Sequence, residues 1–265
     1  MRKIKSEQIV EQVKKLCIEA SLYLGEDVLS CIKEKAKSEK SEVGKNILNI
    51  LVENAEIAKE KDLWIIADEV YREFVYDGLE YTSCGNLEGV QDRVIIIDSV
   101  SKRYSACGAR IGSIACKNKG LIAQILKLCQ GRLCVPTLEQ IGAVELYKTP
   151  VSYFKAVNEE YKKRRDVLYN ELMKVEGVIC KKPTGAFYIV AKLPVENAED
   201  FTIWMLKEFN KDNETVMVCP AEGFYATPGL GRDEIRLAYI LNEKDLHRAA
   251  TLLKEGLEQY VALQK

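Results

Sequence analysis

The sequence has one histidine, His247, and almost no net charge, since 39 basic and 40 acidic residues leave −1. One histidine argues against a histidine-based catalytic triad and against a mixed Cys/His zinc site. His247 falls in a C-terminal helical pattern, so we expect a surface residue. The well-mixed charges give no basic stripe for nucleic acid and no polybasic tail for a membrane. Small neutral or anionic metabolites are the expected partners.

Paired cysteines and long apolar runs are also lacking. None of the nine cysteines forms a C-x-x-C pair, and Cys107 with Cys116 or Cys129 with Cys134 are too loosely spaced for a metal knuckle. There is no signal-peptide pattern and no apolar span that would cross a bilayer. We therefore expect no metal, free thiols and a cytoplasmic globular protein. With 265 residues, 47% of them hydrophobic, the chain can bury a full core in one large or two ordinary domains.

Two apolar runs stand out: L-W-I-I-A-D-E-V-Y at residues 63–71, and V-I-I-I-D-S-V-S-K-R-Y-S-A-C-G-A-R-I-G at 94–112. Each begins as a β-branched run typical of a parallel strand buried on both faces, and each ends in polar residues. Parallel strands bring their carboxyl ends to one edge, where open α/β sheets bind ligands. The residues expected at this edge are Asp68, Tyr71, Ser99, Lys102 and Arg110.

The chemistry of these five side chains suits pyridoxal 5'-phosphate. That cofactor requires a lysine amine, a carboxylate for its ring nitrogen, a donor for its ring hydroxyl, and cationic or hydroxyl groups for its phosphate. Lys102, Asp68 and Tyr71 match the first three needs, and Ser99 with Arg110 match the last. Short patterns such as D-x-x-Y and S-x-x-K also occur by chance, so the strand context is what favours a site.

D-E-V-Y followed by S-V-S-K-R-Y-S-A-C-G-A-R-I-G resembles the class I aminotransferases of PLP fold type I, from about Asp62 to the C-terminus. The resemblance implies that Lys102 is the Schiff-base lysine, that Asp68 pairs with the ring nitrogen and that Tyr71 pairs with the ring hydroxyl. It also implies that Ser99 and Arg110 hold the phosphate. The implied function is transfer of an amino group between an L-amino acid and a 2-oxo acid, which is a reaction of amino-acid metabolism. The resemblance also implies a homodimer.

Later motifs extend the resemblance. P-T-G-A-F-Y at 183–188, C-P-A-E-G-F-Y at 219–225 and G-R-D-E-I-R-L-A-Y at 231–239 match the aminotransferase pattern. The match implies that Arg236 binds the substrate α-carboxylate, a task that suits a fork-shaped donor on a strand. The alternative is a surface arginine on an edge strand.

The N-terminal segment resembles a different family. K-K-L-C-I-E-A at 14–20 and G-K-N-I-L-N-I-L-V-E-N-A-E-I-A-K-E at 44–60 are similar to the N-terminus of the alpha subunit of class I, iron–sulfur fumarate hydratases. That family continues into a cysteine segment that helps to hold its cluster, whereas this chain continues into the D-E-V-Y strand. We therefore expect no iron–sulfur cluster, with Cys17 and Cys31 as small core residues. The chain resembles a fusion across a helix that both families share, whether natural, engineered or artefactual.

The expected fold is α/β: an incomplete PLP fold type I large domain at 62–150 and a small C-terminal α/β domain at 151–265, after an N-terminal helical segment at 1–61. The expected helices follow the apolar period, and they begin near Ser6 and then span 26–37, 43–61, 118–129, 136–146, 151–174, 198–210 and 243–260. Besides the two runs above, the expected strands span 113–116, 185–191, 216–219 and 234–239.

Several parts of a fold type I site have no counterpart in the sequence. No Gly-rich phosphate turn and no ring-stacking aromatic precede Asp68, and no N-P-T-G supplies the usual asparagine donor. Early strands of the large sheet are missing too, which would leave open edges. The expected activity is therefore an impaired aminotransferase. The alternative is a non-catalytic fusion product or scaffold that still binds the cofactor, and hydro-lyase activity is a weaker third.

Overall fold

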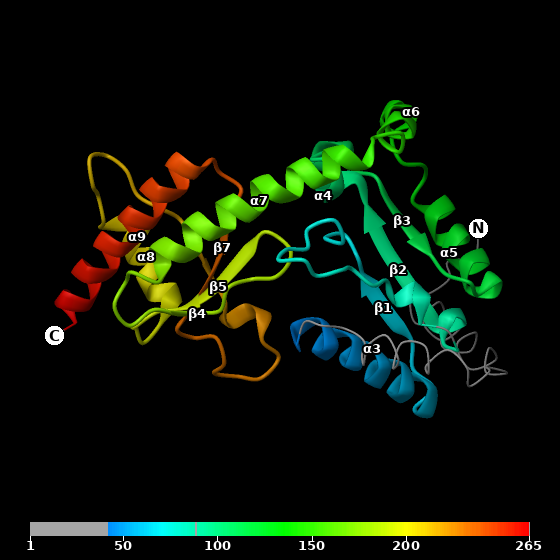
Figure 1. Cartoon of the computed structure of the whole chain (residues 1–265), viewed down its shortest axis with the longest axis horizontal. Coiled ribbons are helices and arrows are strands. Elements are labelled where there is room, and N and C mark those ends of the chain that lie inside the picture. Colours follow the sequence, from blue (N-terminus) through cyan, green and yellow to red (C-terminus); the bar gives the residue numbers. More distant parts are fainter. Residues whose placement is uncertain (1–41, 88, 265) are drawn as a thin grey trace. The chain divides into compact units, whose positions relative to one another are not determined.

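The computed structural model describes residues 42–87 and 89–264, which divide into two compact units. Unit 1 comprises residues 42–73 and 78–150, and unit 2 comprises residues 74–77 and 151–264. The two helices expected within residues 1–41, together with Cys17 and Cys31, lie outside the described residues. Figure 1 labels the elements of both units.

Unit 1 contains a three-stranded sheet in the order β1-β2-β3, formed by β1 (Ile65–Asp68), β2 (Val94–Ser99) and β3 (Gly112–Ala115). β1 and β2 are parallel, with Asp68 opposite Ile97. β3 runs antiparallel to β2, with Ser99 opposite Gly112. The predicted parallel pairing is confirmed, and it brings the carboxyl ends of β1 and β2 to one edge of the sheet.

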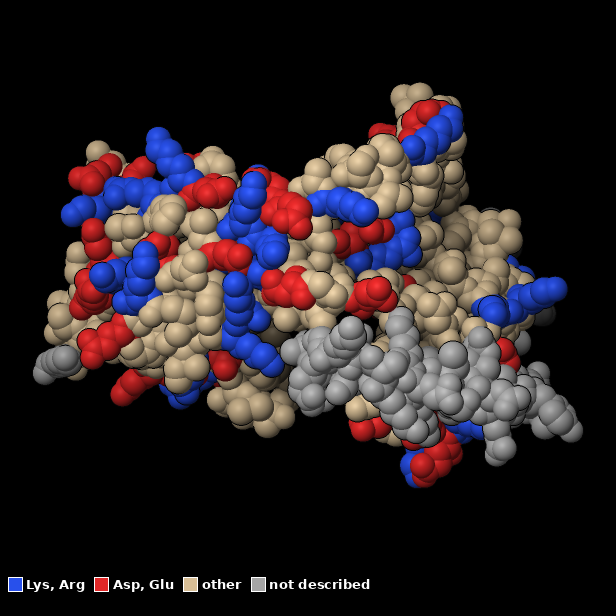
Figure 2. Space-filling model, viewed as in Figure 1, with Lys and Arg blue, Asp and Glu red and all other residues tan. Residues whose placement is uncertain are grey.

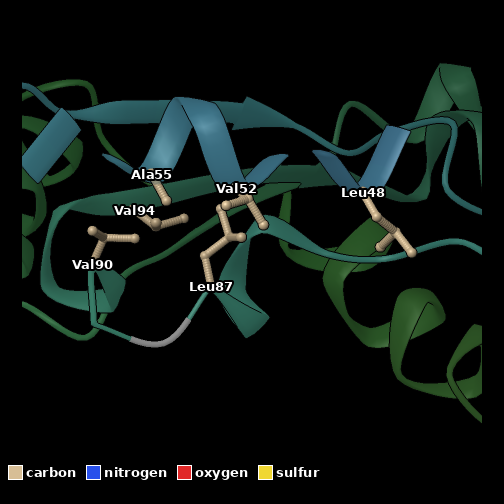
Figure 3. Packing of buried hydrophobic residues seen from close by; sticks show 6 residues of the cluster. All are labelled: Leu48, Val52, Ala55, Leu87, Val90 and Val94. Atoms are coloured by element: carbon tan, nitrogen blue, oxygen red, sulfur yellow. The ribbon is translucent and has the colours of Figure 1, made fainter. Parts of the chain in front are cut away.

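Helix α3 (Glu42–Glu60) supplies one side of the core of unit 1. Its side chains Leu48, Val52 and Ala55 project toward Leu87, Val90 and Val94 (Figure 3), and all six are at most 4% exposed. This is the apolar stripe expected from a helical period. Near the end of α3, Ala58 is 3% exposed, whereas its neighbour Ile57 is 50% exposed. The stripe therefore continues through Ala58.

The expectation that both strand runs are buried on both faces is wrong for β1. Ile65 packs against the α3 core, whereas Ile66, one residue later on the opposite face, is 66% exposed. Ile114 of β3 is also exposed. An apolar run reports that a strand suits a buried sheet, but it does not report which layers are present to cover each face.

Unit 1 has further helices beyond α3. It contains the one-turn helix α4 (Val100–Arg103), then α5 (Lys119–Gly131) and α6 (Thr137–Leu146). Asn118 caps α5 by accepting a hydrogen bond from the Leu121 N–H at 2.9 Å. Pro136, the predicted first residue of this helix, lies immediately before α6. Several apolar side chains on α5 and α6 are exposed, among them Leu126, Leu138, Ile141 and Val144.

Unit 2 is a second α/β unit. Its antiparallel sheet has the order β4-β5-β7-β6, formed by β4 (Ile179–Cys180), β5 (Tyr188–Lys192), β6 (Cys219–Pro220) and β7 (Glu234–Ala238). Its helices are α7 (Val151–Leu172), α8 (Ala198–Lys207) and α9 (Glu243–Leu263), and α9 contacts both α7 and α8. None of the helices within the described part of the chain is long and apolar enough to cross a membrane.

Two predicted strands of unit 2 are shorter than the sequence pattern suggested. The strand expected from Gly185 begins at Tyr188, because Ala186 has a φ of 58° and interrupts the extended backbone. The strand expected at 216–219 reduces to Cys219–Pro220. Just before it, the Thr215 hydroxyl donates to the carbonyl oxygen of Met205 at 2.7 Å, and proline has no N–H for a ladder. Helix α7 and strand β7 lie close to their predicted bounds.

The four residues Phe74–Asp77 lie between two segments of unit 1 in the sequence but belong to unit 2 in the structure; we call them the strap. Val75 forms an antiparallel bridge with Gly185, and the Tyr76 hydroxyl donates to the Ala186 carbonyl at 2.5 Å. The Arg165 guanidinium, which is fully buried, meets both carboxylate oxygens of Asp77 at 2.6 and 3.0 Å. The chain therefore passes between the units after residues 73, 77 and 150.

Candidate active site

The carboxyl edge of β1 and β2 begins with the last residue of each strand. Asp68 ends β1 with an exposed side chain, whose Oδ1 accepts a hydrogen bond from the Val70 N–H at 3.3 Å. Ser99 ends β2 and is half-buried. Because the two strands are parallel neighbours in register, both side chains lie at the same edge.

Lys102 and Tyr71 follow these strand ends directly. Lys102 is on α4, which begins at the residue after Ser99, and Tyr71 lies three residues beyond Asp68. The Lys102 Nζ is 6.0 Å from the centroid of the Tyr71 ring. An amine, a phenol, a carboxylate and a hydroxyl therefore all come from the carboxyl ends of β1 and β2 or from the residues directly after them.

Ser99 also organises the start of α4. Its Oγ accepts from the Ser101 N–H at 2.9 Å and donates to the Ser101 Oγ at 2.7 Å. The hydroxyl thus caps the helix and pairs with a second hydroxyl one residue before Lys102. Sequence reasoning missed Ser101, although the repeated serine of S-V-S-K was a signal for it.

Arg110 lies in the turn between α4 and β3. Its backbone is left-handed, with φ 53° and ψ 39°, and its exposed side chain donates from Nη1 to the Cys107 carbonyl at 3.1 Å. The carbonyl of the next residue, Ile111, accepts from the Val100 N–H at 3.2 Å. This bond ties the Arg110 turn to the beginning of α4. A guanidinium has five N–H donors, so one bond to Cys107 leaves donors for an anion.

An apolar cavity of about 640 Å³ lies beside this edge in unit 1. Arg110 and Asp98 line it together with aliphatic side chains of β2, β3 and α5, including Ile97, Ile114 and Leu126. The lining does not include Asp68, Tyr71, Ser99 or Lys102. Arg110 is therefore the member of the predicted site that reaches this cavity.

Glu69, which follows Asp68, is a further residue that sequence reasoning missed. It is 6% exposed, and the Ser83 hydroxyl reaches both of its carboxylate oxygens at 2.9 Å. The Cys84 N–H also donates to Oε1 at 2.9 Å. Burial, and then the hydrogen bond and charge of Glu69, raise the pKa of the Tyr81 hydroxyl, which keeps it protonated. Glu69 thus fixes the chain directly after Asp68.

Arg236 is the predicted site residue that belongs to unit 2. It is half-buried on β7, opposite Val190 of β5. Its guanidinium carbon is 4.6 Å from the centroid of the Tyr188 ring and 4.4 Å from that of the Phe224 ring. Two aromatic rings therefore hold the plane of the guanidinium. Among residues 42–87 and 89–264, no carboxylate forms an ion pair with Arg236.

In the face shown in Figure 2, basic and acidic side chains are interspersed over the described residues. Within that same part of the chain, no group of three or more His, Cys, Asp or Glu side chains could hold a metal ion. His247 is exposed and its Nδ1 lies 3.1 Å from Glu171, as expected for a surface residue.

An α/β unit with these groups at the carboxyl edge of parallel strands is typical of pyridoxal-phosphate-dependent transferases. The family model "Aminotransferase class I and II" matches residues 48–253, and the chain belongs to this family, whose cofactor is pyridoxal 5'-phosphate. A second model, "Fumarate hydratase (Fumerase)", matches residues 10–68. Both predicted resemblances are therefore confirmed. The two matches overlap from Leu48 of α3 through Asp68 of β1.

Individual proteins agree with the family. The probable aspartate/prephenate aminotransferase of Aquifex aeolicus is 32% identical over 208 residues, which are 77% of this chain and 52% of that protein. An aromatic aminotransferase structure from Pyrococcus horikoshii is 27% identical, with a TM-score of 0.69 over 79% of this chain and 55% of that one. The chain thus spans about half the length of the curated relatives it matches.

The predicted fold type is confirmed as well. The alpha-aminoadipate aminotransferase of Thermus thermophilus, solved with N-(5'-phosphopyridoxyl)-L-leucine, has a TM-score of 0.71 over 82% of this chain and 55% of that one. At 24% identity this likeness concerns the fold alone. The roles of the six predicted site residues remain predictions.

Proposed function

We propose that the chain binds pyridoxal 5'-phosphate and transfers an amino group between an L-amino acid and a 2-oxo acid, with low turnover. The observation that carries the proposal is that Asp68 and Ser99 end the parallel strands β1 and β2, and that Tyr71 and Lys102, whose amine is 6.0 Å from the Tyr71 ring, follow these strand ends. These residue types are the set that such a cofactor requires.

The chain's own side chains fit the parts of the cofactor. The exposed Asp68 carboxylate would accept a hydrogen bond from the protonated ring nitrogen, and the Tyr71 hydroxyl would donate to the ring oxygen. Ser99 and the remaining donors of Arg110 would bind the phosphate. Lys102 would bind the aldehyde carbon through its amine.

When bound, pyridoxal phosphate withdraws electrons from the bonds to the substrate Cα. Lys102 is the base that this chain offers for the proton at Cα. Asp68 keeps the ring nitrogen protonated by its negative charge. Lys102 would therefore transfer the proton, and Asp68 would stabilise the positive charge on the ring nitrogen.

Arg236 would bind the substrate α-carboxylate. Its guanidinium contacts the rings of Tyr188 and Phe224, which restrict its motion, so less freedom is lost when it forms a bidentate pair. In an intact family fold we further propose that two copies of the chain associate as a homodimer.

The proposed low turnover rests on family motifs that have no counterpart in this sequence. The sequence lacks the Gly-rich phosphate turn, the stacking aromatic and the N-P-T-G donor of the family. Each missing polar contact typically costs about 1–3 kcal/mol, and several together remove many powers of ten in rate. The same observation supports a second candidate, a non-catalytic fusion product that still binds the cofactor.

Reductive trapping tests the binding half of the proposal. Purified protein is incubated with pyridoxal phosphate, treated with borohydride and mapped by peptide mass spectrometry. We expect the label on Lys102, no label there in Lys102→Ala, and unchanged labelling in the control Lys127→Ala, which alters an exposed lysine of α5. Label confined to other lysines at saturating cofactor would overturn the proposal.

Steady-state kinetics test the catalytic half and separate the two candidates. Aspartate, alanine and aromatic amino acids are assayed with 2-oxoglutarate, and Lys102→Ala gives the background rate. Slow turnover above that background supports an impaired aminotransferase. Cofactor binding without turnover above background supports the non-catalytic candidate, and turnover at a level ordinary for enzymes would contradict the predicted impairment.

A further inference from the structure

Asp98, on β2 immediately before Ser99, has three partners for one carboxylate. Its Oδ2 is 2.8 Å from Arg103 Nη2 and 3.1 Å from Arg72 Nη2. Its Oδ1 accepts from the Ser99 N–H at 2.8 Å. The Asp98 side chain is 15% exposed and the Arg103 side chain 8% exposed, so water screens the Arg103 pair weakly.

The two arginines occupy informative positions in the chain. Arg72 directly follows Tyr71, and Arg103 directly follows Lys102. One carboxylate on the central strand therefore holds both segments that carry the candidate site. Glu73 closes the group, since its Oε1 lies 3.4 Å from Arg103 Nε and 3.7 Å from Arg72 Nε.

Helix α4 needs such an anchor because it has four residues. A single helical turn is not stable by itself, so tertiary contacts must hold it. At one end the Ser99 hydroxyl caps it, and at the other Arg103 attaches it to Asp98. Lys102 lies between these two attachments.

We propose that Asp98 is a positioning residue that sets the distance between the Lys102 amine and Tyr71 by holding Arg103 and Arg72 together. Asp98 acts through these two arginines and not by contact with a ligand. The inference rests on the proposed function, since it concerns the reactivity of Lys102 toward the aldehyde of pyridoxal phosphate. Loss of the link frees the Tyr71 segment from α4 and lets the Lys102 amine leave its productive position.

The test measures the rate at which pyridoxal phosphate, trapped with borohydride, labels Lys102 in the full chain. In Asp98→Asn we expect labelling to slow by about 10-fold or more, because a displacement near 1 Å at a reacting group costs that much or more. The matched control is Asp62→Asn, which makes the same change in the Arg93–Asp62 ion pair at 2.9 Å elsewhere in unit 1. Labelling in this control should equal that of the unmodified chain.

Arg72→Gln keeps the test decisive if Asp98→Asn does not fold. It removes the partly exposed arm next to Tyr71 and leaves the Asp98–Arg103 pair intact. We expect slower labelling of Lys102 here as well, with rescue by Arg72→Lys, because a single Nη2–Oδ2 contact can be made by an ammonium. If the Arg72–Asp98 pair only stabilised the fold, Arg72→Gln would lower the melting temperature without changing the labelling rate of the folded protein.

The outcomes separate the inference from the function it rests on. If Lys102 is labelled at the same rate in folded Arg72→Gln as in the unmodified chain, the inference is overturned and cofactor binding remains supported. No label on Lys102 of the unmodified chain would overturn both. Slow labelling in Arg72→Gln that Arg72→Lys restores would support Asp98 as the link.

Discussion

Asp68 and Arg110 lie at one edge but are predicted to serve different parts of the cofactor. Asp68→Asn keeps the size of the side chain and removes the negative charge that would keep the ring nitrogen protonated. We therefore expect a large loss of turnover, with cofactor affinity nearly unchanged. Arg110→Ala removes phosphate donors, so affinity should fall more than the turnover of the loaded protein.

These two variants are compared by cofactor titration and by steady-state kinetics at saturating cofactor. Arg132→Ala is a control for Arg110→Ala, because Arg132 is an exposed arginine that also lines the cavity in unit 1. Equal losses of affinity and turnover in both Asp68→Asn and Arg110→Ala would contradict separate roles.

The pair Arg165–Asp77 makes the stability of the protein depend on pH. Hydrogen bonds from the Arg165 guanidinium lower the pKa of Asp77 below its ordinary value of 3.8. A carboxyl whose pKa is lower folded than unfolded stabilises the fold above its unfolded pKa, and this contribution disappears as the pH falls through the folded value. The unfolding midpoint should therefore drop on acidification from about pH 5, and Asp77→Asn should make this drop smaller.

Chemical denaturation at a series of pH values measures this dependence. Asp212→Asn is the control, since Asp212 pairs with Arg248 at 3.3 Å on the surface with a side chain that is 72% exposed. Such exposed pairs contribute little to stability. An Asp77→Asn profile parallel to that of the unmodified chain would show that Asp77 is not linked to folding.

At the scale of elements, helix α3 is the clearest case for a stability measurement. Leu48 is 4% exposed in the α3 core, so Leu48→Ala should destabilise unit 1 by about 2–5 kcal/mol through lost burial and a residual cavity. Ile50, two residues on, is 54% exposed, and Ile50→Ala should change stability by no more than about 0.5 kcal/mol. Urea unfolding compares the two, and similar losses would mean that α3 is not packed on β2.

Elements with a strong period could be predicted from the sequence. The stripe of α3, the parallel β1–β2 pair and the long helices α7 and α9 follow from spacing and composition. The cover of each sheet face and the short strands could not be predicted. The exposure of Ile66 depends on which layers cover that face of β1, and β5 starts late because Ala186 takes a positive φ. Neither feature leaves a local pattern in the sequence.

The same limit applies to the candidate site. Asp68, Tyr71, Ser99 and Lys102 could be assigned to one edge because parallel pairing follows from the two runs. Their neighbours could not be assigned, since their meaning depends on partners distant in sequence. Glu69 is buried through Ser83 and Cys84, and Asp98 acquires its importance through Arg72 and Arg103.

At the scale of the whole molecule, the N-terminal match raises the question of fumarase chemistry. The fumarate hydratase match ends at residue 68, the last residue of β1, and the sequence continues with the E-V-Y of the aminotransferase motif and not with the cluster-binding cysteine segment. We expect anaerobically purified protein to contain no stoichiometric iron or sulfide and to leave fumarate unhydrated. Iron and sulfide assays with a coupled malate assay measure this, and reconstitution of a stable cluster would contradict it.

The strap has a consequence for how this protein can exchange its parts during evolution. A genetic crossover at codon 150 would transfer helix α7 and everything after it, but not Phe74–Asp77. The recipient would then inherit a fully buried Arg165 that keeps Asp166 of α7 but loses Asp77, the carboxylate that meets two of its nitrogens. Recombinants that keep both carboxylates of Arg165 should either join before codon 74 or bring an aspartate of their own at position 77, so the strap favours inheritance of the two units together.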